Sequence, residues 1–267
     1  MRTFGTYIVS AHDFFIRHNL TITEWTAIRQ HWERTSPTHS QVSLIHLINH
    51  YTDKGWKAFD PADPYWNIPA YSNSHLGTIR NQLLNRTERP SRSIFVFGTA
   101  FHELLLQPET VADIRDYYLP ISKLKTIYQM RDAATANGTI QTIQQSTSIE
   151  SIITWTDATT GLPCKAKIDA IINKLNGDNS TIFDLKTTSC NSQEAFENAC
   201  NQYDYWRQMA FYMDGAQADS VVLMGVQKRK PYHLFFVTAK PNDSRILQAR
   251  ARYQFILQKA VQLGIEP

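Results

Sequence analysis

Two aspartates and a lysine that could act together on a phosphate lie close in the sequence, at Asp169, Asp184 and Lys186. Carboxylate oxygens are the ligands that Mg²⁺ and Mn²⁺ prefer, and these hard ions hold phosphates while keeping several waters. The chemistry that such a site favours is metal-assisted hydrolysis, in which a bound ion acidifies water and neutralises charge. The three residues can act together only if the chain between them folds back on itself.

A β-hairpin is the predicted connection between the two aspartates. Asn176-Gly177 is the strongest short hairpin pattern that a sequence offers. If these two residues form the turn, Asp169 lies directly opposite Asp184; if the loop has four residues, Asp169 faces Lys186 and Asp184 lies on the neighbouring diagonal. Side chains alternate with period two, so either loop places all three on one face. A three-residue loop with a bulge would break this arrangement.

The two faces of the predicted hairpin differ in character. One is expected to be polar and consists of Lys165, Lys167, Asp169, Ile171, Ile182, Asp184 and Lys186. The other is expected to face the core and consists of Ala166, Ile168, Ala170, Ile172, Phe183, Leu185 and Thr187. Like charges that lie directly opposite destabilise a strand pair, so two facing carboxylates require a cation between them. The alternative is a solvated strand face held by weak cross-strand ion pairs.

Helices and strands that could position these residues are predicted on both sides of the hairpin. The predicted helices lie near 22–32, 42–51, 75–84 (with Ser72 as N-cap), 94–106 (beginning near Gly98), 191–213 and 243–263, with a mixed helical stretch up to 137. The predicted strands lie at 148–156, 164–175, 181–188, 220–227 and 232–238.

This order of elements predicts an α+β, or mixed α/β, fold class. We expect a central mixed sheet that contains an antiparallel meander and is flanked by helices. Residues 1–70 are expected to form a helical N-terminal extension, and residues 71–267 the main domain.

The composition is that of a globular protein of 267 residues, because 42% are hydrophobic and 19% are charged. No apolar run approaches the ~18 residues of a membrane helix, and the charged start of the sequence is unlike a signal peptide. The three cysteines form no CxxC pair, which argues against a disulfide framework or a four-cysteine metal site. A cytoplasmic location is therefore expected. A formal net charge of +3 permits an anionic partner without requiring one.

Four segments resemble the motifs of one nuclease superfamily. Asp169 followed by Asp184-Leu185-Lys186 resembles the D…(D/E)xK signature of the PD-(D/E)XK nucleases. The segment 98–109, which contains His102, resembles the GxxxH helix of the RecE-type branch. That branch contains exonuclease VIII and is related to RecB nuclease domains and phage lambda-type exonucleases.

Two further segments extend the resemblance to about residues 70–240. The segment 203–212 is similar to the QxxxY helix of that branch, and 72–84 resembles its N-terminal serine and helix. The resemblance implies a restriction-endonuclease-like core for the main domain.

The resemblance also implies a metal site. Asp169 and Asp184 would bind the ion, with the main-chain carbonyl of Leu185 completing its shell and His102 as an additional ligand. The implied cofactor is Mg²⁺, for which Mn²⁺ could substitute. For His102 the alternative is a histidine buried in the core among apolar neighbours.

Four other residues receive roles from the resemblance. Lys186 would orient or help to deprotonate the attacking water and stabilise the charge that develops at phosphorus. Gln208 and Tyr212 lie four apart and share a helix face, so they would brace the site or touch DNA. The alternative is a helix that packs its aromatic side on the sheet. Glu150 lies on the preceding strand, where relatives often carry a glutamate, and the alternative for it is an exposed strand residue.

The function that the resemblance implies is a Mg²⁺-dependent deoxyribonuclease. The form expected is a RecE-like exonuclease that acts on double-stranded DNA ends in phage-type recombination. The family implies a ring-shaped homo-oligomer, a single-strand annealing partner of the RecT type, and no membrane association. The alternatives are a structure-selective or restriction-type endonuclease on the same core, and a non-catalytic DNA-binding module.

Overall fold

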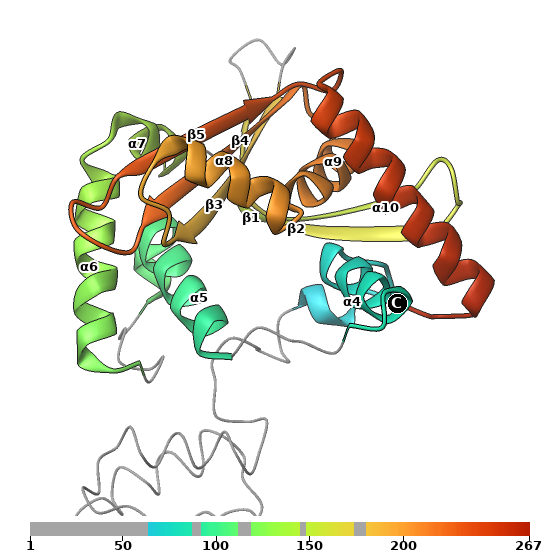
Figure 1. The fold of residues 1–267 in the computed structure, drawn as a ribbon, viewed down its shortest axis with the longest axis horizontal. Helices are drawn as coiled ribbons and strands as arrows, with labels where there is room; N and C mark the ends of the chain where they lie inside the picture. The colour runs from blue at the N-terminus through green and yellow to red at the C-terminus, as the bar shows by residue number, and fades with distance from the viewer. Residues whose placement is uncertain (1–63, 87–91, 112–118, 145–147, 174–179) are drawn as a thin grey trace, which may run out of the picture.

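The computed structural model describes residues 64–86, 92–111, 119–144, 148–173 and 180–267 (Figure 1). The helices predicted at 22–32 and 42–51, and nearly all of the predicted N-terminal extension, lie outside these residues. The described helices are α4 (Asn73–Leu83), α5 (Arg92–Leu106), α6 (Ile121–Thr135), α7 (Gly138–Gln144), α8 (Gln193–Gln202), α9 (Tyr205–Ala216) and α10 (Ser244–Leu263), with 3₁₀ turns at Pro64–Asn67 and Pro108–Thr110. None of them has the length and apolar content that crossing a bilayer requires.

A five-stranded mixed sheet forms the centre of the molecule. Its strands are β1 (Ser148–Thr156), β2 (Pro163–Asn173), β3 (Ser180–Thr188), β4 (Ser220–Gln227) and β5 (Leu234–Ala239), and their spatial order follows the chain. All neighbours are antiparallel except β3 and β4, which are parallel and are joined through α8 and α9. The predicted fold class, a mixed sheet with an antiparallel meander flanked by helices, is therefore confirmed.

Helices cover both faces of the sheet (Figure 1). Side chains of α4, α8, α9 and α10 form one core cluster with the sheet, and side chains of α5, α6 and α7 form a second cluster on the opposite face. The prediction of one polar face and one core face is therefore wrong, because a sheet between two helical layers is buried on both sides. Lys165 and Asp184 of the expected polar face are accordingly only 3% and 2% exposed.

The side-chain alternation of β2 also changes at Asp169. Ile168 packs in the first core cluster whereas Ala170 packs in the second, although the sequence pattern placed them on the same face. The pairing of β1 with β2 omits Glu150 and Asp169, and Glu150 has a φ of 50°. A residue with positive φ redirects a strand locally. This distortion lies where Asp169 leaves the regular ladder.

The register between β2 and β3 is the one predicted for a two-residue turn. Ala170 pairs with Phe183 and Ile171 with Ile182, so the next position along the strands brings Asp169 opposite Asp184. The four-residue alternative would have shifted every pair by two residues. The turn at 174–179 lies outside the described residues.

The helix predicted over 191–213 consists of two helices. Ser192 caps α8, because its side chain accepts a hydrogen bond of 3.1 Å from the backbone N–H of Ala195. The chain then breaks at Asp204, which adopts the left-handed conformation with a φ of 58°. In the other layer, α5 begins at Arg92 instead of near Gly98.

Replacing Gly225 in β4 with alanine is expected to destabilise the fold. A Cβ there would lie 2.6 Å from the ring of Phe196, which is fully buried and stacks on Phe235 at 5.9 Å between centroids. Because that ring cannot move away, Gly225→Ala should lower the free energy of unfolding in urea by about 1–3 kcal/mol. Gly98→Ala is the control: a Cβ meets nothing within 4 Å on α5 and should add about 0.5–1 kcal/mol. Equal stability of the two variants would contradict this account of the β4 contact.

Candidate active site

Asp184 is a buried carboxylate on β3 that contacts both a lysine and a glutamine. It forms an ion pair with Lys186, two residues further along the strand. Gln208 of α9 donates one hydrogen bond of 2.9 Å to Asp184 Oδ1 and another of 3.0 Å to the hydroxyl of Tyr212. One face of α9 therefore fixes the carboxylate of Asp184: Gln208 bonds to it directly, and Tyr212, one helical turn further along, bonds to Gln208.

Burial and charge set the protonation of this pair. Burial raises the pKa of Asp184 to about 6, although the ammonium of Lys186 opposes the shift. Burial acts against the charge on Lys186 as well, but Asp184 and Asp169 outweigh it and raise the pKa of the lysine. Lys186 is therefore an ammonium at neutral pH. Burial also raises the pKa of Tyr212 well above its usual value, so its hydroxyl stays protonated.

Asp169 belongs to a second group of side chains, which comes from three different elements. Ligand atoms of His102 on α5, Glu150 on β1 and Asp169 on β2 all lie within 4.8 Å of one another. His102 Nδ1 is 3.5 Å from Asp169 Oδ2, and the same oxygen accepts a hydrogen bond of 2.6 Å from the backbone N–H of Leu185. The neighbouring strand β3 thus fixes the carboxylate of Asp169.

The pKa values in this second group respond to one another. Burial alone would lower the pKa of His102, but Asp169 outweighs it and raises the value. Burial alone would raise the pKa of Asp169, but His102 outweighs it and lowers the value. Burial and the charge of Asp169 together raise the pKa of Glu150, although Lys167 opposes them with an ion pair of 3.3 Å. The two carboxylates therefore favour positive charge beside them, which His102 and Lys167 supply in part.

An imidazole and two carboxylates that converge in this way fit a divalent metal ion. His102, Glu150 and Asp169 are the residues that would hold it. Asp184 is not part of this group; Gln208 donates to its Oδ1 and Lys186 pairs with it, and it lines the same small cavity as Asp169. The carbonyl of Leu185, expected as a ligand, stays a prediction.

Two residues beside the site had no role in the sequence analysis. Lys167 pairs with Glu150, and the ring of Tyr205 lies 5.0 Å from Lys186 Nζ. Tyr205 precedes Gln208 by three residues, which is the spacing of one helix face and could have indicated its position. Glu150, for which an exposed position was the alternative, is largely buried, with 17% of its side chain accessible.

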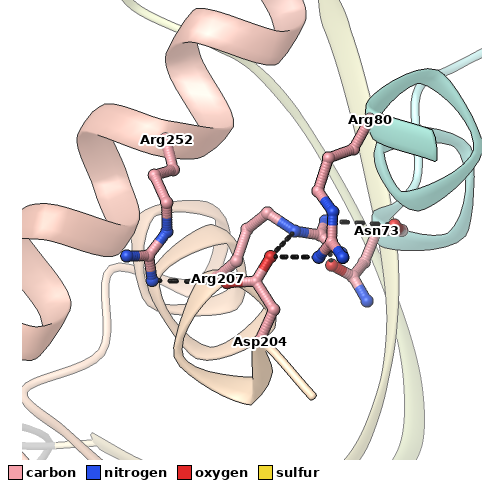
Figure 2. A network of polar contacts seen from close by, with 5 residues as sticks. All are labelled: Asn73, Arg80, Asp204, Arg207 and Arg252. Atoms are coloured by element: carbon pink, nitrogen blue, oxygen red, sulfur yellow. Dashed lines mark hydrogen bonds and ion pairs between the residues drawn. The ribbon is translucent and has the colours of Figure 1, made fainter. Parts of the chain in front are cut away.

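A network of charged residues fixes the start of α9 and hence the position of Gln208 (Figure 2). Asp204 Oδ2 accepts hydrogen bonds of 2.9 Å from Arg80 of α4 and 2.8 Å from Arg207 of α9. Arg252 of α10 lies 3.3 Å from Asp204 Oδ1. Arg207 also donates 2.7 Å and 3.2 Å bonds to the side chain and carbonyl of Asn73. Three helices are thereby joined at the break between α8 and α9.

Comparison with solved structures gives matches that include proteins described as exonucleases. A protein from Eubacterium rectale described as "Putative exonuclease" is similar with a TM-score of 0.57 and 11% identity, over 76% of this chain and 84% of that one. A phage-related exonuclease from Haemophilus somnus gives a TM-score of 0.41 and 8% identity, over 76% and 90% of the two chains. LHK-Exo in complex with dAMP gives 0.38 and 15% identity, over 74% and 91%. Only the first of these scores is high enough to support a shared fold. No curated protein matches the chain.

A sequence-family model covers most of the described fold. The model, described as "PDDEXK-like domain of unknown function (DUF3799)", matches residues 79–263. The matched segment contains His102, Glu150, Asp169, Asp184 and Lys186. The resemblance to PD-(D/E)XK nucleases that the sequence motifs indicated is thus confirmed, and the chain belongs to the family of PDDEXK-like DUF3799 domains.

Proposed function

We propose that the protein is a metal-dependent deoxyribonuclease. The observation that carries this proposal is the hydrogen bond from the Leu185 N–H to Asp169. It places the group that His102, Glu150 and Asp169 form next to strand β3. That strand carries the ion pair of Asp184 and Lys186. A cation held by the converging carboxylates, together with the ammonium of Lys186 beside Asp184, would suit an anionic substrate.

Each residue then has a task in phosphodiester hydrolysis. A divalent ion held by His102, Glu150 and Asp169 would acidify water and neutralise the charge of the phosphate. Lys186 orients the attacking water and stabilises the negative charge that develops, in a site from which most water is excluded. Gln208 and Tyr212 hold Asp184, and with it the ammonium of Lys186, in a fixed orientation.

The finer form of the proposal is an exonuclease of the RecE type. It would act on the ends of double-stranded DNA with Mg²⁺, for which Mn²⁺ could substitute, in phage-type recombination in the cytoplasm. Its partners would be other copies of the chain and a single-strand annealing protein of the RecT type. The motifs around His102, Asp184 and Gln208 and the fold shared with the Eubacterium rectale protein support this form.

End-labelled linear DNA and closed circular DNA of the same sequence test the proposal. The protein should shorten the linear molecule in Mg²⁺, leave the circle intact, and do nothing in EDTA. Lys186→Ala should slow cleavage by about 10²–10³-fold, because the ammonium acts on the developing charge. Lys240→Ala, which removes an exposed lysine before α10, is the matched control and should cleave at the normal rate. Nicking of the circle would instead favour an endonuclease, and cleavage in EDTA would refute the metal requirement.

A further inference from the structure

The rings of two tyrosines lie side by side, tilted against each other, beside the candidate active site. The rings of Tyr203 and Tyr205 lie 5.7 Å apart between centroids with an interplanar angle of 32°. Tyr205 in turn lies 5.0 Å from Lys186 Nζ, so the pair extends from the candidate catalytic lysine towards the surface. Tyr203 forms the outer end of the pair and is 62% exposed.

The break between α8 and α9 brings the two rings together. Residues two apart in a continuous helix point in different directions and do not stack. The left-handed conformation of Asp204 changes the direction of the chain between Tyr203, the C-cap of α8, and Tyr205, the first residue of α9. A non-glycine residue in this conformation costs free energy, and the contacts of Asp204 with three arginines offset that cost (Figure 2).

We infer that Tyr203 and Tyr205 form a stacking platform for an unpaired nucleobase next to the phosphate that Lys186 contacts. This inference rests on the proposed function, since it takes a nucleic-acid strand as the ligand. Aromatic rings bind bases of any sequence through their π-faces, and positive charge nearby attracts the phosphates. Tyr203, whose side chain is largely exposed, offers its ring to the base, while Arg252, half-exposed in the adjacent network, adds to the positive charge. The substrate class is therefore a strand whose base at the reacting end is unstacked from its duplex.

Strands that lack one base test the platform directly. Binding of short single-stranded oligothymidylates would be measured with the full chain in EDTA, with an abasic nucleotide moved along the strand. At one position the loss of the base should weaken binding by about 5- to 150-fold. Tyr203→Leu should remove this difference between the complete and abasic strands, and Tyr203→Phe should retain it. Tyr128→Leu is the matched control, because it removes a partly exposed tyrosine that lies on α6 near Arg131.

The outcomes separate the platform from the nuclease proposal. Thermal unfolding of Tyr203→Leu should match that of the parent, since the side chain is largely exposed. The inference is wrong if Tyr203→Leu still discriminates against the abasic strand, or if the parent discriminates at no position. Cleavage of linear DNA in Mg²⁺ by the unsubstituted protein is measured in parallel and tests the nuclease proposal. Discrimination against the abasic strand without cleavage supports the platform and refutes the nuclease proposal. Cleavage without discrimination supports the nuclease proposal and refutes the platform.

Discussion

Asp169→Asn is expected to lower the rate of DNA cleavage by on the order of 10³-fold or more. A carboxylate that holds a catalytic ion contributes several kcal/mol of transition-state stabilisation, and each 1.4 kcal/mol is a factor of about ten in rate. Asparagine keeps the size of the side chain and can still accept the hydrogen bond from the Leu185 N–H, so the fold should persist. Initial rates on end-labelled linear DNA at saturating Mg²⁺ measure the loss.

Metal binding distinguishes the role of Asp169 from a general disturbance of the site. Titration of Mn²⁺ into the protein without DNA should show weaker binding for Asp169→Asn than for the parent, because one of three converging ligands has lost its charge. The matched control is Asp132→Asn on α6, which removes an exposed aspartate that pairs with Arg131 and should change neither quantity. Parent-like cleavage by Asp169→Asn would show that this carboxylate does not serve the reaction.

The geometry between β2 and β3 could be predicted from the sequence because it depends on local patterns. Asn176-Gly177 predicts a two-residue turn, and the register that follows from such a turn is the one that β2 and β3 have, although the side-chain alternation of β2 changes at Asp169. The strands β1 and β4 were also predicted at the bounds that the structure has. Their turn residues and β-branched composition are local features of the same kind.

Features that depend on distant parts of the chain could not be predicted in this way. The helical pattern continues across Asp204, and the break depends on Arg80 and Arg252, which are far from it in sequence. The burial of Lys165 depends on the carbonyls of Tyr65 and Ile68, which accept hydrogen bonds of 2.9 and 2.8 Å from its ammonium. An alternating strand pattern cannot show that a second helical layer will cover the polar side chains.

The candidate site illustrates the same limit. Asp184 and Lys186 are in contact within β3, Gln208 and Tyr212 are in contact within α9, and Gln208 joins the two pairs; their motifs indicated each of them. Glu150 reaches Asp169 only because β1 pairs with β2 and its backbone turns at that point, which no local pattern specifies. The charge balance of the site therefore became clear only from the fold.

Asp204→Gly is expected to lower the free energy of unfolding by about 3–5 kcal/mol. Arg207 has only 7% of its side chain exposed, and within the described part of the chain Asp204 is the acidic group that it contacts. Removing one partner of a buried ion pair leaves the other charge uncompensated, which costs that amount. Glycine is well suited to the left-handed conformation at this position, so the backbone effect should favour the variant. Any loss in urea-induced unfolding is therefore due to the side chain.

The exposed arginine of the same network provides the control that makes this prediction sharp. Arg252→Ala removes a contact to the same carboxylate, but its side chain is 50% exposed, so the loss should stay below about 1 kcal/mol. If Asp204→Gly and Arg252→Ala lowered the free energy of unfolding equally, the burial of Arg207 would not explain the effect of Asp204. Because α9 begins at this break and carries Gln208 to Asp184, Asp204→Gly should also slow cleavage at temperatures where it remains folded. The network would then be the means by which three distant helices fix the orientation of the candidate catalytic carboxylate.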